Sequence, residues 1–223
     1  MRAPPPSVAA GGLLAALICG CVSSLTGQST LYAAVSVDNG SRATLVVIGA
    51  RLPVGSVHDV VGLEGTAWLL GKTLAAQANA ALSGDAGVTV DVGRSSTLFT
   101  LSALPNAWGV AWAMLERTLF DATLDSTSFE RERTRLSGQV LFQSGSPALD
   151  SEGRVVQLVS SPSNPWARSP RGTRASLDAL TIHDAQLLRR SKYSATSSVV
   201  AAVGLGDNAV LREHPAQLAN SPP

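Results

Sequence analysis

The sequence predicts an α+β fold: a two-layer sandwich in which a mostly antiparallel sheet carries helices packed on one face. Short segments of alternating apolar residues occur in pairs, joined by glycine-containing turns. Longer segments, in which apolar residues recur every three or four positions, are interleaved with them. The first period is typical of half-buried strands and the second of amphipathic helices. Interleaved strand pairs and helices favour two layers around one core.

Length and composition fit one globular domain with additional terminal segments. The chain has 223 residues, of which 45% are hydrophobic and 15% charged, and its net charge is +1. We interpret the arginine-rich spots as solvated faces without a nucleic-acid footprint. These spots are Arg131, Arg133 and Arg135; Arg171 and Arg174; and Arg189, Arg190 and Lys192.

Residues 1–21 have the pattern of a signal peptide. The apolar run from Val8 to Gly20 is too short to span a bilayer as a mature helix. Residues 18–21, ICGC, resemble a bacterial lipobox, in which Cys21 is lipidated and becomes the mature N-terminus. Ile18 and Cys19 depart from the usual lipobox residues, so simple secretion stays open. We expect an exported protein, periplasmic or an outer-membrane-anchored lipoprotein of a bacterium, that contacts the membrane only through a lipid anchor.

The rest of the chain divides into a polar linker (22–34), one domain (35–207) and a tail or truncated linker (208–223). Both cysteines lie in the leader, so the domain has no disulfide and no thiolate ligand. Asp38-Asn39-Gly40 predicts a hairpin between the first two strands. A second hairpin is predicted over 87–104, with its turn at 93–96, and a buried strand over 197–204.

Five segments are predicted as helices. The first has its apolar stripe from Leu63 to Ala81. The others are a helix marked by Trp108 and Trp112, one that opens near Thr127 with Glu130 in a capping-box spacing, one over 152–160, and one that opens at Thr181 with Asp184. The Pro/Ser-rich segment before Thr173 is predicted as a loop.

Five segments in this order resemble the N-terminal domain of the insulinase/pitrilysin-like (inverzincin) metallopeptidases. They are the DNG hairpin, the GARLPVGSVHD strand and turn, the Gly-x-Ala helix, FERER, and PWARSPRGT followed by LTIHDAQLLRRSKYSATSSVVAAVG. The resemblance covers about 35–207 and implies a peptidase-like α+β domain.

The resemblance also implies where a zinc site would lie. The family holds zinc with H-x-x-E-H on a helix, where the two histidines bind the metal and the glutamate takes a proton from its water. Matching Gly65-Thr66-Ala67 to the family's Gly-x-Ala places Trp68 and Lys72 at the histidines and Gly71 at the glutamate. The distal ligand falls on or near Gln139. Indole and ammonium groups offer no lone pair, glycine has no side chain, and glutamine is neutral, so the motif is degenerate and zinc is expected to be absent.

No other group of residues in the sequence indicates a replacement for the zinc site. We interpret His58, His183 and His214 as surface or capping residues, and there is no G-x-S-x-G. Lys72 with a lowered pKa remains conceivable as a nucleophile or base. Trp68, Trp108 and Trp112 are interpreted as core or interface aromatics.

Three functional hypotheses follow from these observations. The first is a non-catalytic exported domain that forms a hetero-oligomer with an active insulinase-family subunit or binds unfolded peptide, because two-chain members of the family pair a zinc chain with one that lacks zinc. The second is an active zinc metalloendopeptidase with unrecognised ligands. The third is a stand-alone envelope scaffold.

Overall fold

The structure, a computed structural model, describes residues 35–37, 44–144, 155, 161 and 164–204. Its strands are β1 (Val35–Val37), β2 (Val46–Leu52), β3 (Ala86–Val92), β4 (Thr97–Ala103) and β5 (Val199–Val203). Its α-helices are α2 (Thr66–Ala81), α3 (Trp108–Phe120), α4 (Ser126–Ser144), α6 (Arg174–Ala179) and α7 (Ile182–Lys192), with short 3-10 turns η1 (Ser56–His58), η2 (Pro165–Ala167) and η3 (Ala195–Ser197). The predicted leader, linker and tail lie outside the described residues, as does the helix over 152–160 apart from residue 155.

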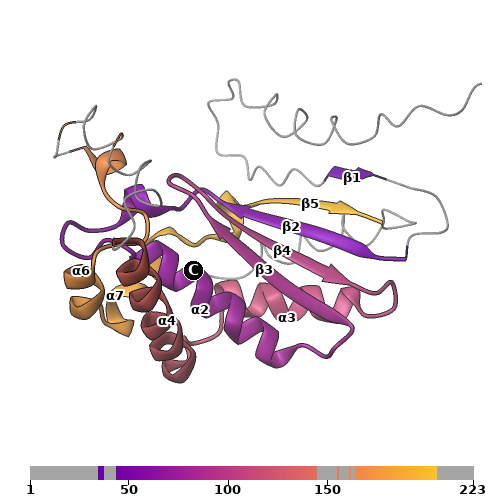
Figure 1. Ribbon diagram of the computed structural model, residues 1–223. Coiled ribbons are helices and arrows are strands. Elements are labelled where there is room, and N and C mark those ends of the chain that lie inside the picture. Colours follow the sequence, from indigo (N-terminus) through magenta and orange to yellow (C-terminus); the bar gives the residue numbers. More distant parts are fainter. Residues whose placement is uncertain (1–34, 38–43, 145–154, 156–160, 162–163, 205–223) are drawn as a thin grey trace, which may run out of the picture.

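Figure 1 shows the sheet as one layer and the helices together on one of its faces. The strand order is β1-β5-β2-β4-β3, and every neighbouring pair except β1 and β5 is antiparallel. This confirms the predicted two-layer α+β architecture. The predicted hairpin at 93–96 is also confirmed, because β3 and β4 pair from Val92 and Thr97 outward.

The hairpin predicted at Asp38-Asn39-Gly40 is wrong. β1 does not pair with β2, because β5 lies between them, parallel to β1 and antiparallel to β2. A turn sequence favours a local reversal of the chain, whereas the choice of partner depends on which strands gain burial in the complete sheet. Val200 and Ala202 of β5 are buried in this central position. β5 reaches this position by pairing with strands that lie far from it in the sequence.

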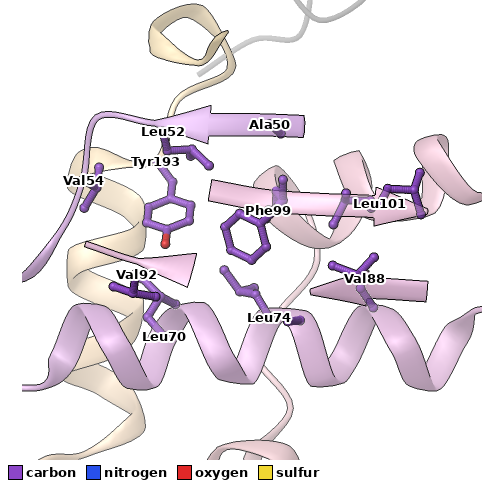
Figure 2. Packing of buried hydrophobic residues seen from close by; sticks show 14 of the residues in the cluster. Ala50, Leu52, Val54, Leu70, Leu74, Val88, Val92, Phe99, Leu101 and Tyr193 are labelled. Carbon is purple, nitrogen blue, oxygen red and sulfur yellow. The ribbon is translucent and has the colours of Figure 1, made fainter. Parts of the chain in front are cut away.

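The core lies between the sheet and α2. On β2, Val46, Ile48, Ala50 and Leu52 point into it, while the alternate residues are partly or fully exposed. Figure 2 shows Phe99 of β4 and Leu74 of α2 meeting there, next to the ring of Tyr193, which follows α7. Trp112 is buried, and Trp68 and Trp108 pack against the core as partly buried side chains, which confirms that these three residues are core aromatics.

The helix N-termini follow the sequence in one case and depart from it in another. At α7, Thr181 and Asp184 form the predicted capping box. At α4, the cap is Asp125 and not Thr127: the Asp125 carboxylate accepts the N–H of Ser128 at 2.7 Å. The cap therefore lies two positions earlier than predicted, and the N–H group that it satisfies is that of Ser128 and not that of Glu130.

Arg189 was expected on a solvated face but is 9% exposed. Its guanidinium donates to three main-chain carbonyls at the end of α3: Leu119 at 2.9 Å, Thr118 at 3.1 Å, and Ala122. The helical pattern of α7 does not show this partner, which lies 70 residues earlier in the chain. Among the described residues, none of the helices is long and apolar enough to cross a membrane.

Candidate functional site

The candidate site begins where α2 begins. Gly65, the residue before the helix, has φ +98, a conformation that glycine adopts without steric cost. The buried carboxylate of Asp59 accepts the N–H groups of Gly65 and Ala67, each at 2.8 Å. Asp59 therefore caps α2 from the preceding turn. His58 lies in that turn, and its Nδ1 accepts the N–H of Gly55 at 3.2 Å, which fits its interpretation as a capping residue.

Burial raises the pKa of Asp59 from 3.8 to about 6, an effect that outweighs the two N–H bonds and the positive charge of Arg168. The folded state thus holds this proton more tightly than the unfolded chain does. We expect the free energy of unfolding to fall as the pH rises from about 4 to 6, by up to roughly 3 kcal/mol from this group. The measurement is urea unfolding at pH 4 to 7. Asp59→Asn should flatten this slope, and Asp178→Asn, at an exposed site, should not; equal slopes in all three proteins would contradict the assignment.

A loop that is distant in sequence packs against the start of α2. The Arg168 guanidinium donates to the Asp59 main-chain oxygen at 2.7 Å. Gly172, with φ +79, lies so close to the Glu64 main chain that an added Cβ would be 2.2 Å from its oxygen. The hydroxyl of Ser176, on α6, donates to that same oxygen at 2.8 Å.

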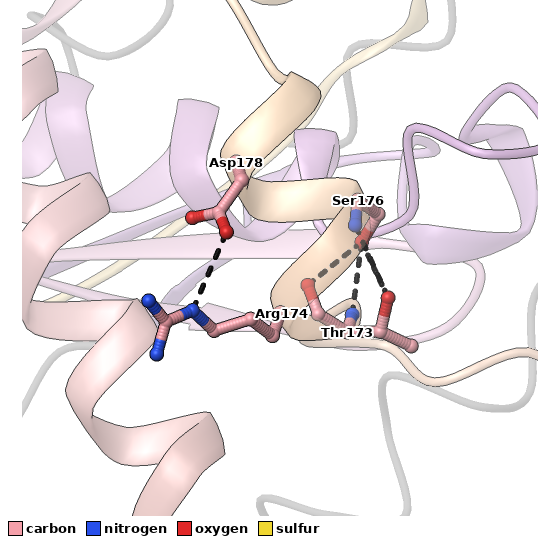
Figure 3. Close-up of polar contacts among 4 residues, drawn as sticks. All are labelled: Thr173, Arg174, Ser176 and Asp178. Atoms are coloured by element: carbon pink, nitrogen blue, oxygen red, sulfur yellow. Dashed lines mark hydrogen bonds and ion pairs between the residues drawn. The ribbon is translucent and has the colours of Figure 1, made fainter.

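Short-range bonds hold α6 in this position. Figure 3 shows the capping box between Thr173 and Ser176 and the ion pair between Arg174 and Asp178 one turn apart. The capping box fixes the Ser176 hydroxyl at the first turn of the helix. The exposed ion pair adds little to stability. The loop and α6 together bring Arg171 next to α2.

Trp68 and Lys72 lie one helical turn apart, on the same side of α2. The Lys72 amine is 5.5 Å from the centre of the Trp68 ring, and the Arg171 guanidinium is 4.7 Å from it. Both distances are within the range of cation–π attraction. The Lys72 amine also donates to the carbonyl of Val90, on β3, at 2.8 Å.

Burial lowers the pKa of Lys72, and the positive charge of Arg135 lowers it further. The negative charges of Glu132 and Asp91 oppose this shift. Glu132 and Arg135 lie on α4 and form an ion pair at 2.8 Å. The surroundings of Lys72 are therefore a mixture of both charge signs, which sequence spacing on α2 alone does not indicate.

Gly71 packs directly against β3. A Cβ at this position would be 2.7 Å from Cγ2 of Val92 and 3.5 Å from Cγ2 of Val90. These distances leave no room for a larger side chain unless Val92 moves. The space into which residue 71 would project is therefore filled by a valine.

We expect Gly71→Ala to destabilise the protein by about 1–3 kcal/mol, because the overlap with Val92 exceeds the gain in helix propensity. Gly138→Ala, in α4 where an added Cβ meets nothing within 4 Å, should instead stabilise it by roughly 0.5–1 kcal/mol. Chemical denaturation of both variants checks the difference. A stabilising Gly71→Ala would show that Val92 moves away readily.

Gln139, the residue that the resemblance matches to the distal ligand, is exposed on α4. The acidic residue of α4 that influences Lys72 is Glu132. The FERER segment contains Glu132, so a sequence signal for it exists. Arg171 lies in the PWARSPRGT segment, but its place beside Trp68 depends on the contacts of Arg168, Gly172 and Ser176 with the start of α2, which the sequence does not indicate.

The described residues at the matched positions do not fit a zinc ion. Structural and catalytic zinc sites need three or four lone-pair donors from His, Cys, Asp or Glu. Within the described residues, no group of three such side chains is assembled. At the matched positions the Lys72 amine donates to a carbonyl and Val92 fills the space beside Gly71.

Comparison with known proteins gives a likeness in structure only. No protein-family model matches the chain, and no curated protein matches it significantly. A solved structure described as a peptidase M16 inactive domain from Pseudomonas fluorescens matches with TM-score 0.70 and 17% identity over 82% of this chain and 47% of that one. An M16-like peptidase structure from Alicyclobacillus acidocaldarius matches with TM-score 0.68 and 16% identity over 84% of this chain and 47% of that one.

Pitrilysin also matches, with TM-score 0.68 and 16% identity over 83% of this chain and 21% of its own. The chain thus spans about half the length of the first two structures. It has an insulinase/pitrilysin-like fold, as the order of sequence motifs predicted.

Proposed function

We propose that this chain is a non-catalytic insulinase-like domain that works by associating with a homologous, zinc-bearing subunit. The proposal rests on the observation that Val92 fills the space beside Gly71, and that the Lys72 amine donates to the Val90 carbonyl. A water-activating glutamate would have to stand where Val92 lies, and a metal ligand would have to replace an amine.

The comparison with one solved structure supports this reading. One structural neighbour is itself described as an inactive domain, and the chain spans 47% of that protein. Peptide binding within such an assembly is a further element of the proposal, since the resemblance implies that homologous domains enclose unfolded peptide.

The test is reconstitution from purified components. The tagged chain is purified from its own host, and a co-purifying protein with an H-x-x-E-H motif is then produced separately. A 1:1 complex, with higher peptidase activity than the partner alone, supports the proposal. Peptidase activity of this chain by itself would favour the active-enzyme alternative, and a monomer that binds no such homologue would favour the scaffold alternative.

We also propose export and lipidation at Cys21. Mass spectrometry of the mature N-terminus is the direct measurement. A diacylglyceryl-modified Cys21 supports a lipid anchor. An unmodified N-terminus in the periplasm would show simple secretion instead.

A further inference from the structure

β3 is a terminal strand of the sheet, so one of its edges has no partner strand within the described residues. The N–H of Gly93 donates to Ser96 at 2.8 Å, and the N–H of Leu104 donates to Asp85 at 2.9 Å. These bonds close the two ends of the ladder with β4. Successive residues of a strand direct their N–H and C=O groups to opposite edges. The N–H and C=O groups of the even-numbered residues, including Val88 and Val90, therefore point to the outer edge.

Two side chains of α2 form hydrogen bonds with the main-chain groups of β3 that point to the outer edge. The Asn79 amide donates to the Val88 carbonyl at 2.7 Å and accepts the Val88 N–H at 2.8 Å. An Asn side chain has the donor and acceptor that a neighbouring strand would present. Lys72 donates to the Val90 carbonyl at 2.8 Å. Asn79 and Lys72 are two helical turns apart, so both reach the strand from the same face of α2.

We propose that Asn79 and Lys72 are side-chain caps that close the outer edge of β3 to strand addition by a second copy of this chain. An unpaired edge strand offers a row of donors and acceptors to any extended chain, and proteins protect such edges with side chains, lysine in particular. A second β3 would have to displace three hydrogen bonds before it formed its own. The inference concerns this edge alone and does not rest on the proposed association.

The test compares Asn79→Ala/Lys72→Met with the unaltered chain. Gln77→Ala is the matched control: Gln77 lies on the same helix and bonds main-chain groups through both its nitrogen and its oxygen, at Thr123 and Asp125, away from the sheet edge. Sedimentation velocity measures self-association over a range of concentrations. Amide hydrogen exchange reports on Val88 and Val90.

The double variant should exchange its Val88 amide rapidly when dilute. It should self-associate at a concentration at least about tenfold lower than the unaltered chain, and the Val88 and Val90 amides should become protected from exchange as it does so. Gln77→Ala should behave like the unaltered chain.

Two results would overturn the proposal. One is a folded double variant with an unprotected Val88 amide and unchanged self-association. The other is an unaltered chain that already pairs through β3. If the double variant does not fold, Lys72→Met alone, which keeps both Asn79 bonds, is measured in the same way; increased association supports the proposal and unchanged association contradicts it.

Discussion

Arg189→Met is expected to destabilise the protein by about 3–5 kcal/mol. The substitution keeps an apolar stem of similar length but removes the donors to Thr118, Leu119 and Ala122. Carbonyls left unsatisfied in a buried place cost about 1–3 kcal/mol each, with partial relief from water. The positive charge at the C-terminus of α3 is lost as well, where it complements the helix dipole.

Urea unfolding of three variants checks this expectation. Arg190→Met, at the next and exposed residue, should change the free energy of unfolding by no more than about 0.5 kcal/mol. Arg189→Lys should lie between the two, because an ammonium lacks the planar fork that reaches several carbonyls at once. A loss below about 1 kcal/mol for Arg189→Met would mean that water replaces the guanidinium without difficulty.

Gly172→Ala is expected to cost about 3 kcal/mol or more. An alanine would have to adopt φ +79, and its Cβ would be 2.2 Å from the Glu64 oxygen. The conformational cost alone is about 1–2 kcal/mol, and relief of the overlap separates the loop from α2. Arg171 would then move away from Trp68.

Gly62→Ala separates the two contributions. Gly62 has φ +85, but an added Cβ there meets nothing within 4 Å. It should therefore show only the conformational cost of about 1–2 kcal/mol. Thermal or chemical unfolding measures both variants, and equal losses would show that the contact between Gly172 and Glu64 contributes nothing.

The local elements could be predicted because their signals are local. The stripe from Leu63 to Ala81 predicted α2, and Val88, Val90 and Val92 predicted β3 by alternation. The capping box at Thr181 predicted the start of α7. In each case neighbouring residues hold both the pattern and its hydrogen-bond partners.

The features that were wrong or missed depend on distant partners. The strand beside β2 is β5, about 150 residues later, which no turn sequence at Asn39-Gly40 can indicate. Arg189 looks like a surface residue until the end of α3 is placed next to it. The sequence does not predict the short helix α6, which follows the predicted loop, because a helix of this length shows no apolar period.

The order of the sequence motifs located the candidate site, but the side chains that pack around it could not be predicted. Spacing placed Trp68, Gly71 and Lys72 on one helix, and the structure places them there. Which side chains surround them is decided by β3, α4 and the loop before α6. The contacts of Val92 and Arg171 are therefore findings of the structure.

We propose that this domain, with its insulinase-like fold, does not hold zinc. The test is to measure metal in the purified chain after equilibration with zinc and removal of the unbound ion. We predict no stoichiometric zinc, in the unaltered chain and in His58→Ala and His183→Ala alike. One zinc per chain, lost on replacing either histidine and accompanied by peptidase activity, would contradict the account.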